Sequence, residues 1–236
     1  MREAITFDDV LLEPRYSNIK SRSEVDIGSS LGIIAKTSVV METSSTCRAA
    51  IIQEKTRYKI PIISSPMDTV TEEKMAIAME QAGGLGIIHR YNSIKEQANV
   101  VSSAASEASL GAAIGVTGDF EERACSLYDA GARVICVDVA HGHHALVHLM
   151  AGNVATIEGF SALENWGADS IRVGVGGGSI CSTRIRTGHG IPTLQSVMNC
   201  ASVARNARII ADGGLKTSGD IVKALAAGAD FVILGS

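Results

Sequence analysis

A junction between a helix and a buried strand recurs along this chain, and it limits the possible folds more than any other feature. At each junction a helical stretch ends at a glycine and an aliphatic run follows within a few residues; the junctions lie at 81–88, 129–138, 166–174 and 227–235. Glycine favours the left-handed conformation that ends many helices, and an aliphatic run is typical of a strand buried on both faces. The alternation predicts parallel strands joined by right-handed crossovers.

The number of candidate strands distinguishes between two parallel architectures. Eight are expected, near 60–66, 85–89, 112–117, 134–139, 149–153, 170–175, 207–212 and 231–235. Eight strands close a (β/α)8 TIM barrel, which is the predicted fold within the α/β class. A doubly wound sheet is the alternative, but its glycine fingerprint follows its first strand, whereas the glycines here follow the late strands. Only 4% of residues are aromatic, so the core must be aliphatic.

Helix starts can also be placed. Thr69 with Glu72, and Ser93 with Glu96, have the spacing of capping boxes, and Ser218 is a candidate N-cap.

We expect one domain over residues 1–236, with an N-terminal arm of about 1–59 in which 31–52 has no assigned role. Two features do not fit a complete barrel. The fourth and fifth strands are separated only by 141–150 or so, and a parallel crossover usually needs about a dozen residues. The sequence also stops directly after the eighth strand. We therefore expect segments of the barrel to be missing from this sequence.

Charge and cysteine usage exclude several classes of protein. The net charge is −4 with both signs interspersed, which favours neither a nucleic-acid groove nor a membrane surface, and no apolar run has the roughly 20 residues of a membrane span. The N-terminus does not resemble a signal peptide. The chain has five cysteines: Cys47, Cys125, Cys136, Cys181 and Cys200. Their irregular spacing argues against a zinc site and against disulfides, and it favours reduced thiols in the cytoplasm.

The loop that contains Cys181 is the strongest candidate for chemistry. Glycines at 174, 176, 177 and 178 precede Ser179 and the thiol, and bare glycine amides let an anion such as phosphate approach closely. A thiol is a nucleophile only as thiolate, which nearby Arg172 and Arg184 would favour, while Thr183 could hydrogen-bond near the reacting centre. The alternative is a glycine-rich turn with a buried cysteine.

Polar residues also end three of the expected strands. Asp138, Asn153 and Asp212 occupy these positions, and strand ends face the active site of a barrel. A carboxylate suits ribose hydroxyls, and the Gly213–Gly214 amides after Asp212 suit a phosphate, so a nucleotide is indicated; strand-end caps are the alternative. The histidines at 141, 143 and 144 suggest a metal, but no matching acidic or cysteine set lies nearby in sequence.

Taken together, these motifs closely resemble the IMP dehydrogenase/GMP reductase family. The resemblance spans nearly the whole chain except about 31–52, and it rests on motifs at 5–12, 64–72, 83–89, 115–119, the Asp138 strand, the Cys181 loop and 211–214. It implies an oxidoreductase that converts IMP to XMP with NAD⁺, Cys181 being the nucleophile that adds to purine C2.

The resemblance also implies roles for individual residues. Thr183 lies near the reacting carbon, and Asp138, Asn153, Arg172 and Gly174 line the cofactor side. The backbone carbonyls of Gly176, Gly178 and Cys181 bind a monovalent cation, normally K⁺. The substrate contacts are Ser65, Met67, Gly178, Ser179, Asp212, Gly213, Gly214, Gly235 and Ser236.

Pro66 and Glu72 favour the dehydrogenase branch. The alternatives are a GMP reductase, which uses NADPH, and a non-catalytic nucleotide-binding remnant. The given residues contain neither the regulatory cystathionine-β-synthase-type modules of many dehydrogenases, expected between 99 and 111, nor the mobile flap that follows the eighth strand in the family. These segments are either absent from the protein or outside the given residues. We therefore expect slow hydrolysis of the covalent intermediate. The family implies a homotetramer, with no nucleic-acid or membrane partner.

Overall fold

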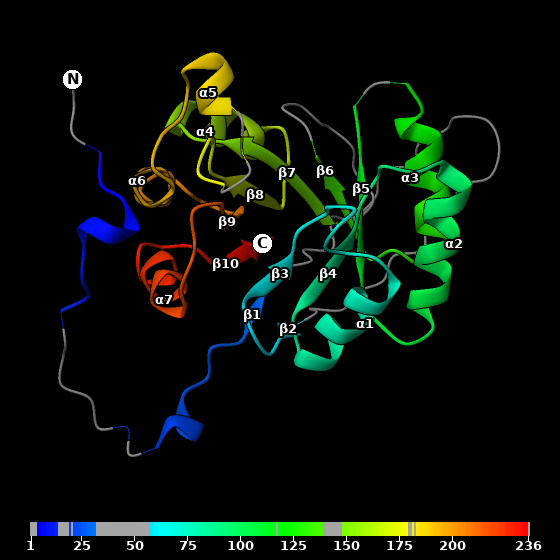
Figure 1. The fold of residues 1–236 in the computed structure, drawn as a ribbon, viewed down its shortest axis with the longest axis horizontal. Helices are drawn as coiled ribbons and strands as arrows, with labels where there is room; N and C mark the ends of the chain where they lie inside the picture. The colour runs from blue at the N-terminus through cyan, green and yellow to red at the C-terminus, as the bar shows by residue number, and fades with distance from the viewer. Residues whose placement is uncertain are drawn as a thin grey trace.

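A closed barrel of eight parallel strands forms the centre of the protein in the computed structural model (Figure 1). The structure describes residues 4–13, 19, 21–31, 57–116, 118–138, 148–178, 181 and 183–235. Each strand pairs with the next along the chain and β10 pairs with β3. The strands are β3 (Ile62–Ser64), β4 (Leu85–Ile88), β5 (Gly111–Ile114), β6 (Val134–Val137), β7 (His148–Val154), β8 (Ser170–Val173), β9 (Arg208–Asp212) and β10 (Phe231–Leu234). The predicted TIM barrel is confirmed, and closure excludes a doubly wound open sheet.

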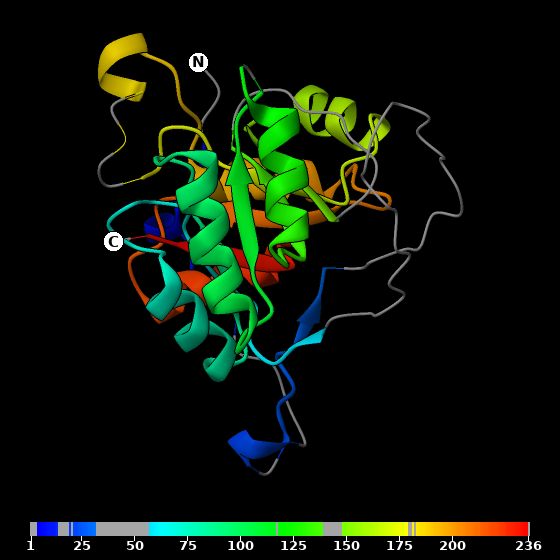
Figure 2. The same cartoon turned by 90° about the vertical axis from the view of Figure 1, so that its right-hand side faces the viewer.

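The helices pack around the barrel in two groups. Helices α1–α3 cover one side and α4–α7 the other (Figures 1 and 2). They are α1 (Glu73–Ala82), α2 (Ile94–Ala105), α3 (Phe120–Asp129), α4 (Ile157–Asn165), α5 (Thr183–Thr187), α6 (Thr193–Ala201) and α7 (Ser218–Ala226). Glycines 83, 131, 167 and 228 have φ between 85° and 111°, which confirms the predicted junctions. None of the described helices is long and apolar enough to cross a membrane.

One of the three predicted helix starts is confirmed. Ser93 and Glu96 form a full capping box at the start of α2. The Thr69–Glu72 prediction is wrong, because 68–70 form a turn and α1 begins only at Glu73, with no side-chain cap. At α7 the N-cap is Thr217, not Ser218, and its box partner is Asp220.

The barrel interior is aliphatic, and a short ribbon contributes to it. Strands β1 (Ser29–Ser30) and β2 (Arg57–Tyr58) pair antiparallel outside the barrel. Leu31 and Tyr58, which flank or end this ribbon, belong to the same buried cluster as Ile63, Met150 and Ile210. The Tyr58 ring lies edge-on to Phe231 of β10 at 5.9 Å. The ribbon thus extends the interior core beyond the eight barrel strands.

The N-terminal arm is attached to the α6–α7 side. Its 3-10 helix, Phe7–Asp9, buries Phe7 in the core cluster that also contains Val197 and Ala224 of these two helices. The Lys223 ammonium donates a hydrogen bond to the carbonyl of Phe7, and the backbone N–H of Ile5 donates one to Gln195.

The barrel closes despite the short connection after β6. Strands β6 and β7 pair in register from Val134↔His148 to Cys136↔Met150. All eight predicted strands therefore pair in the closed barrel, and the expectation of missing segments concerns what lies between and after the strands. Most of the connection, 139–147 with the three histidines at 141, 143 and 144, lies outside the described residues, as does 32–56.

Candidate functional site

Four consecutive strand ends are joined by one hydrogen-bonded network. Arg172 of β8 donates from Nη1 to Asp138 Oδ1 at 2.7 Å, and from Nη2 and Nε to Asp212 Oδ2 at 2.8 and 3.1 Å. Asn153 of β7 donates to the same Asp212 oxygen at 2.7 Å. Asp138 follows β6 and Asp212 ends β9, so the structure brings together four of the five residues that the sequence predicted for the cofactor side and the ribose. The fifth, Gly174, accepts a hydrogen bond from Asn153 Nδ2 at its carbonyl.

The network fixes the charge of its central guanidinium. The Arg172 side chain is only 8% exposed. Burial disfavours its charge, but Asp212 and Asp138 outweigh burial and raise the pKa of Arg172. The Cys136 thiol lies 3.7 Å from Nη1, and burial, partly offset by Arg172, raises the pKa of Cys136 to about 11. Cys136 is therefore a neutral thiol beneath the network.

Cys181 has the opposite electrostatic surroundings. It is half-buried, and its Sγ lies 3.3 Å from Thr183 Oγ1 at the start of α5. Hydrogen bonds from the Thr183 side chain and backbone lower the pKa of the Cys181 thiol, and Arg184 adds to this. Burial raises the pKa of Cys200 to about 11. Cys181 is thus suited to act as thiolate.

The glycines of the Cys181 loop allow close packing against the loop after β9. A Cβ on Gly174 would lie 1.9 Å from the carbonyl oxygen of Asp212, and one on Gly213 would lie 2.9 Å from the nitrogen of Gly178. The amide of Gly174 donates to the carbonyl of Val154 at 2.8 Å, so the expectation that every glycine amide here is bare is wrong at Gly174. The two loops form one contiguous backbone surface next to Cys181.

The remaining predicted substrate positions meet where β10 and β3 pair. A Cβ on Gly235 would lie 3.3 Å from Met67 Sδ and 3.7 Å from Ser65 Cβ. The Ser65 amide donates to the carbonyl of Leu234. Strand β10 also pairs with β9, so this group neighbours the Gly213–Gly214 loop. Ser179 and Ser236 lie outside the described residues.

Arg90 and Tyr91, which follow His89 in the loop after β4, were not among the predicted site residues. Arg90 Nε lies 4.0 Å from Asp138 Oδ2, and the guanidinium lies over the Tyr91 ring at 5.7 Å from its centroid. The signal was present in the sequence, since polar residues directly after a buried strand identified Asp138 by the same reasoning.

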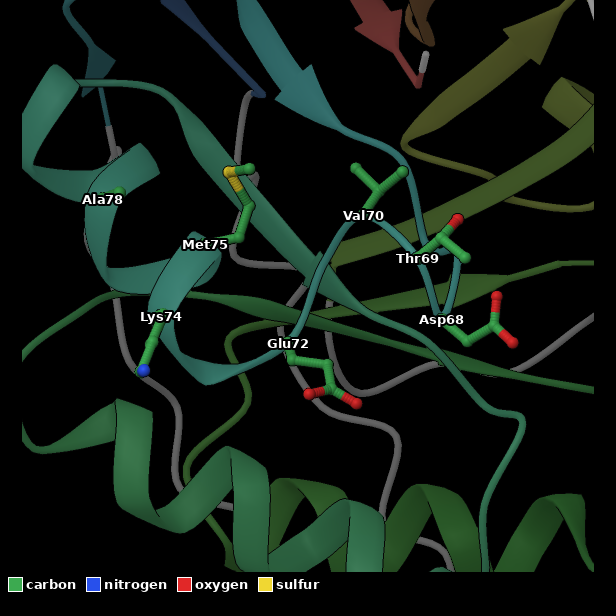
Figure 3. Close-up of a pocket in the computed structure, with 7 residues that line it drawn as sticks. All are labelled: Asp68, Thr69, Val70, Glu72, Lys74, Met75 and Ala78. Atoms are coloured by element: carbon green, nitrogen blue, oxygen red, sulfur yellow. The ribbon is translucent and has the colours of Figure 1, made fainter.

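A separate pocket adjoins the Ser65–Met67 segment. Figure 3 shows that its side chains come from the turn at 68–70 and from the start of α1. Glu72 Oε1 lies 3.3 Å from His89 Nε2, so the pocket borders the loop after β4 and not Cys181. The lining residues are Asp68, Thr69, Val70, Glu72, Lys74, Met75 and Ala78.

Fold and site together define a (β/α)8-barrel protein that gathers a network of polar side chains and a cysteine thiol of lowered pKa at the carboxyl ends of its strands. Within that class the comparison with known sequences is specific. Residues 4–236 match the IMP dehydrogenase/GMP reductase domain, and the chain belongs to this family of oxidoreductases.

Individual relatives carry both names of the family. The chain is 32% identical to inosine-5'-monophosphate dehydrogenase of Nitrosopumilus maritimus, over all of this chain and 75% of the relative. It is 35% identical to the enzyme of the same name from Cryptosporidium parvum, over 99% of this chain and 67% of the relative. It is 29% identical to GMP reductase of Leishmania major, over 99% of this chain and 74% of the relative. The first alignment spans 376 positions against 236 residues of this chain, so at least 140 of its positions have no counterpart here.

Proposed function

We propose that this chain oxidises IMP to XMP with NAD⁺ through a covalent bond between Cys181 and purine C2. The observation that carries the proposal is a thiol with a lowered pKa on a loop packed against the Asp212–Gly214 segment. Membership of the family and the prevalence of dehydrogenase names among the relatives support it.

In this proposal the chain's residues bind IMP and supply the nucleophile. The Cys181 thiolate adds to C2 of the purine, and Thr183 stabilises that thiolate. Asp212 uses Oδ2 for Arg172 and Asn153, which leaves Oδ1 for the ribose hydroxyls. Ser65 and Met67 contact the purine. The proposed phosphate-binding positions are Gly178, Ser179, Gly213, Gly214, Gly235 and Ser236. Ser179 and Ser236 lie outside the described residues, so they are assigned by resemblance alone.

NAD⁺, when bound, accepts the hydride that leaves C2, and water then releases XMP and regenerates the thiol. On the cofactor side, Asp138 offers Oδ2 to a ribose, because Arg172 engages its Oδ1. Arg172 is too buried to contact a ligand over much of its surface, so it acts by fixing Asp138 and Asp212. Asn153 orients Asp212 and also donates to the carbonyl of Gly174, which ties the Cys181 loop to the network.

A monovalent cation, K⁺, belongs to the same proposal. The carbonyls of Gly176, Gly178 and Cys181 would hold it, although the Gly178 carbonyl already accepts the Cys181 amide and has only its second lone pair to offer. Replacing K⁺ with Li⁺ is expected to lower adduct formation. We further propose that residues 1–236 act as one catalytic domain within a cytoplasmic homotetramer.

GMP reductase is the second candidate, because Leishmania enzymes of that name align with 99% of this chain. Intact mass after incubation with IMP and NAD⁺ tests the first candidate. A purine adduct on the wild type that is absent from Cys181→Ala is expected. If no adduct forms and GMP with NADPH is consumed instead, the reductase replaces the dehydrogenase. If no adduct forms and IMP only raises the melting temperature of both proteins, the chain is a non-catalytic nucleotide-binding remnant.

A further inference from the structure

We propose that Thr193 is a positioning residue for the phosphate of the substrate. It acts through the two glycine loops, 174–178 after β8 and 213–214 after β9. Its hydroxyl hydrogen-bonds to the backbone of these loops when they hold the phosphate, and this fixes their amides relative to Cys181. The inference rests on the proposed function, which places the phosphate along both loops. Thr193 is the first residue of α6 and was not among the predicted site residues.

The Thr193 hydroxyl is a buried polar group with unused hydrogen-bonding capacity. The residue is 4% exposed, and its Oγ1 has no hydrogen-bond partner among the described residues. It does not cap its own helix, because α6 begins after Pro192 with no side-chain cap. A hydroxyl offers one donor and two acceptor sites, and burying it without a partner destabilises a fold. Its presence here therefore needs a reason other than stability.

The hydroxyl lies between the two glycine loops. A Cβ on Gly177 would lie 2.5 Å from Thr193 Oγ1, and one on Gly214 would lie 3.7 Å from it. Carbonyl oxygens approach the same two positions. The Gly213 oxygen would lie 3.2 Å from the Cβ on Gly177, and the Gly177 oxygen would lie 3.3 Å from the Cβ on Gly214. These two carbonyls, one from each loop, are therefore the candidate acceptors for the hydroxyl.

Gly177 is required by this hydroxyl and not by its own backbone conformation. In the same loop Gly174 and Gly176 have φ of 147° and 84°, a region that favours glycine, whereas Gly177 is not among the glycines with positive φ. An alanine at 177 would meet Thr193 Oγ1 at 2.5 Å and the Gly213 carbonyl at 3.2 Å. The lack of a side chain at 177 therefore lets the hydroxyl approach the loop.

Helix α6 holds Thr193 in a fixed place. Leu194 and Val197 belong to the buried cluster that also contains residues of β8 and β9. The backbone N–H of Ile5, in the N-terminal arm, donates to Gln195 Oε1 at 3.3 Å. Because the helix is anchored both to the barrel and to the arm, its first side chain is a fixed point against which the two loops are placed.

Protection of Cys181 from iodoacetamide measures the effect without NAD⁺ or any redox step. IMP and inosine are each expected to slow the alkylation, and the ratio of their two dissociation constants gives the contribution of the phosphate. Thr193→Val keeps the shape and removes the hydroxyl, so it is expected to weaken IMP by about fivefold and inosine by less than about twofold. Thr193→Ser keeps the hydroxyl and is expected to retain most of the phosphate contribution.

Thermal melts separate this role from a structural one. Without substrate, Thr193→Val is expected to melt at or above the wild-type temperature, because it removes a buried polar group that has no partner among the described residues. Ser196→Ala is the matched control, since the Ser196 hydroxyl is also buried and unpartnered in the described part of the protein, one turn further along α6. It is expected to leave the IMP-to-inosine ratio unchanged.

Gly177→Ala tests the same contact from the side of the loop. It is expected to weaken IMP by about tenfold. Adding Thr193→Ala to this variant removes the atom that lies 2.5 Å from the new Cβ, so the double variant is expected to recover most of the lost affinity. Additive losses in the two single variants and the double variant would show that the contact does not control the loop.

Other outcomes would also overturn the inference. Equal weakening of IMP and inosine by Thr193→Val, or a fall in its melting temperature, would assign the residue to packing alone. An equal effect of Ser196→Ala, or no protection of the wild type by IMP, would do the same. The Cys181 adduct with IMP and NAD⁺ reports on the proposed function separately. A phosphate effect without an adduct keeps this inference and removes the dehydrogenase, and an adduct without a phosphate effect does the reverse.

Discussion

The hydroxyl of Thr183 controls how much of Cys181 is thiolate near neutral pH. Its hydrogen bond is the largest influence that lowers the pKa of Cys181, so Thr183→Val is expected to raise that pKa. Alkylation of Cys181 by iodoacetamide should then slow several-fold at pH 7.5 and recover at higher pH. Mass spectrometry of the Cys181 peptide across pH measures this and separates it from the exposed Cys125.

Thr187→Val provides the matched control. Thr187 Oγ1 donates to the carbonyl of Thr183 within the same short helix and does not contact the thiol. An unchanged pH profile is expected for it. Equal shifts in both variants would mean that the order of α5, and not the Thr183 hydroxyl, sets the reactivity of Cys181.

Gly174 is required because the loops after β8 and β9 approach each other there. Gly174→Ala would place a Cβ 1.9 Å from the Asp212 carbonyl oxygen at a φ of 147°, so the loop must move. We expect loss of IMP binding and a drop in melting temperature. Gly188→Ala has a positive φ of 70° but open space around its Cβ, and should cost only about 1 kcal/mol of strain with IMP binding retained. Calorimetry and thermal melts distinguish the two.

Among the secondary-structure elements, α7 offers a direct comparison between a predicted and an observed cap. The Thr217 hydroxyl accepts a hydrogen bond from the Asp220 amide, and the Asp220 carboxylate accepts hydrogen bonds from the amides of Thr217 and Lys216. Thr217→Ala should cost about 1 kcal/mol of unfolding free energy, or roughly 2–4 °C in melting temperature. Ser218→Ala should cost no more than a few tenths of a kcal/mol, and a larger effect there than at Thr217 would contradict the observed capping box.

The elements themselves were largely predictable, because four of the eight strands follow a glycine that ends a helix in the left-handed conformation and the other strands are aliphatic runs. Gly83, Gly131, Gly167 and Gly228 identify four of the eight strands, and the aliphatic runs identify the others. The Thr69–Glu72 cap was not predictable by pattern, because the Thr71 hydroxyl binds Ser64 and the Ser65 carbonyl and delays the start of α1. Tertiary contacts decided that start.

The candidate site was predictable only residue by residue. Strand-end position identified Asp138, Asn153 and Asp212, but their shared guanidinium is set by strand order and register. The cofactor role predicted for Arg172 gave no hint that its side chain is almost wholly paired with two carboxylates. Arg90 was missed because its contact with Asp138 joins two strands that are not neighbours in the barrel.

At the scale of the whole molecule, a buried polar pair lies at the start of two neighbouring barrel strands, away from the strand ends that carry the candidate site. His148 begins β7 and its Nε2 lies 2.8 Å from the hydroxyl of Ser170, which begins β8. Both residues are buried, and His148 Nδ1 has no hydrogen-bond partner among the described residues. Burial lowers the pKa of His148 to about 3. This histidine stays neutral in the folded barrel.

The neutral His148 predicts how the stability of the barrel depends on pH. An unfolded histidine binds a proton below about pH 6.5, whereas folded His148 binds one only near pH 3, so the unfolded state takes up more protons between these values. Stability is therefore complete above about pH 6.5 and falls by about 1.4 kcal/mol for each unit below it. The backbone N–H groups of Asn206 and Ala207 overcome burial and lower the pKa of Glu164 to about 2, so Glu164 adds to this loss only below about pH 4.5.

Urea unfolding between pH 7 and pH 4.5 isolates the contribution of His148. His148→Gln keeps a donor for Ser170 and removes the titrating ring, so it should flatten the slope in this window. His189→Gln, at an exposed position, should keep the wild-type slope. A slope that survives in His148→Gln would show that a group other than His148 takes up a proton on unfolding in this window.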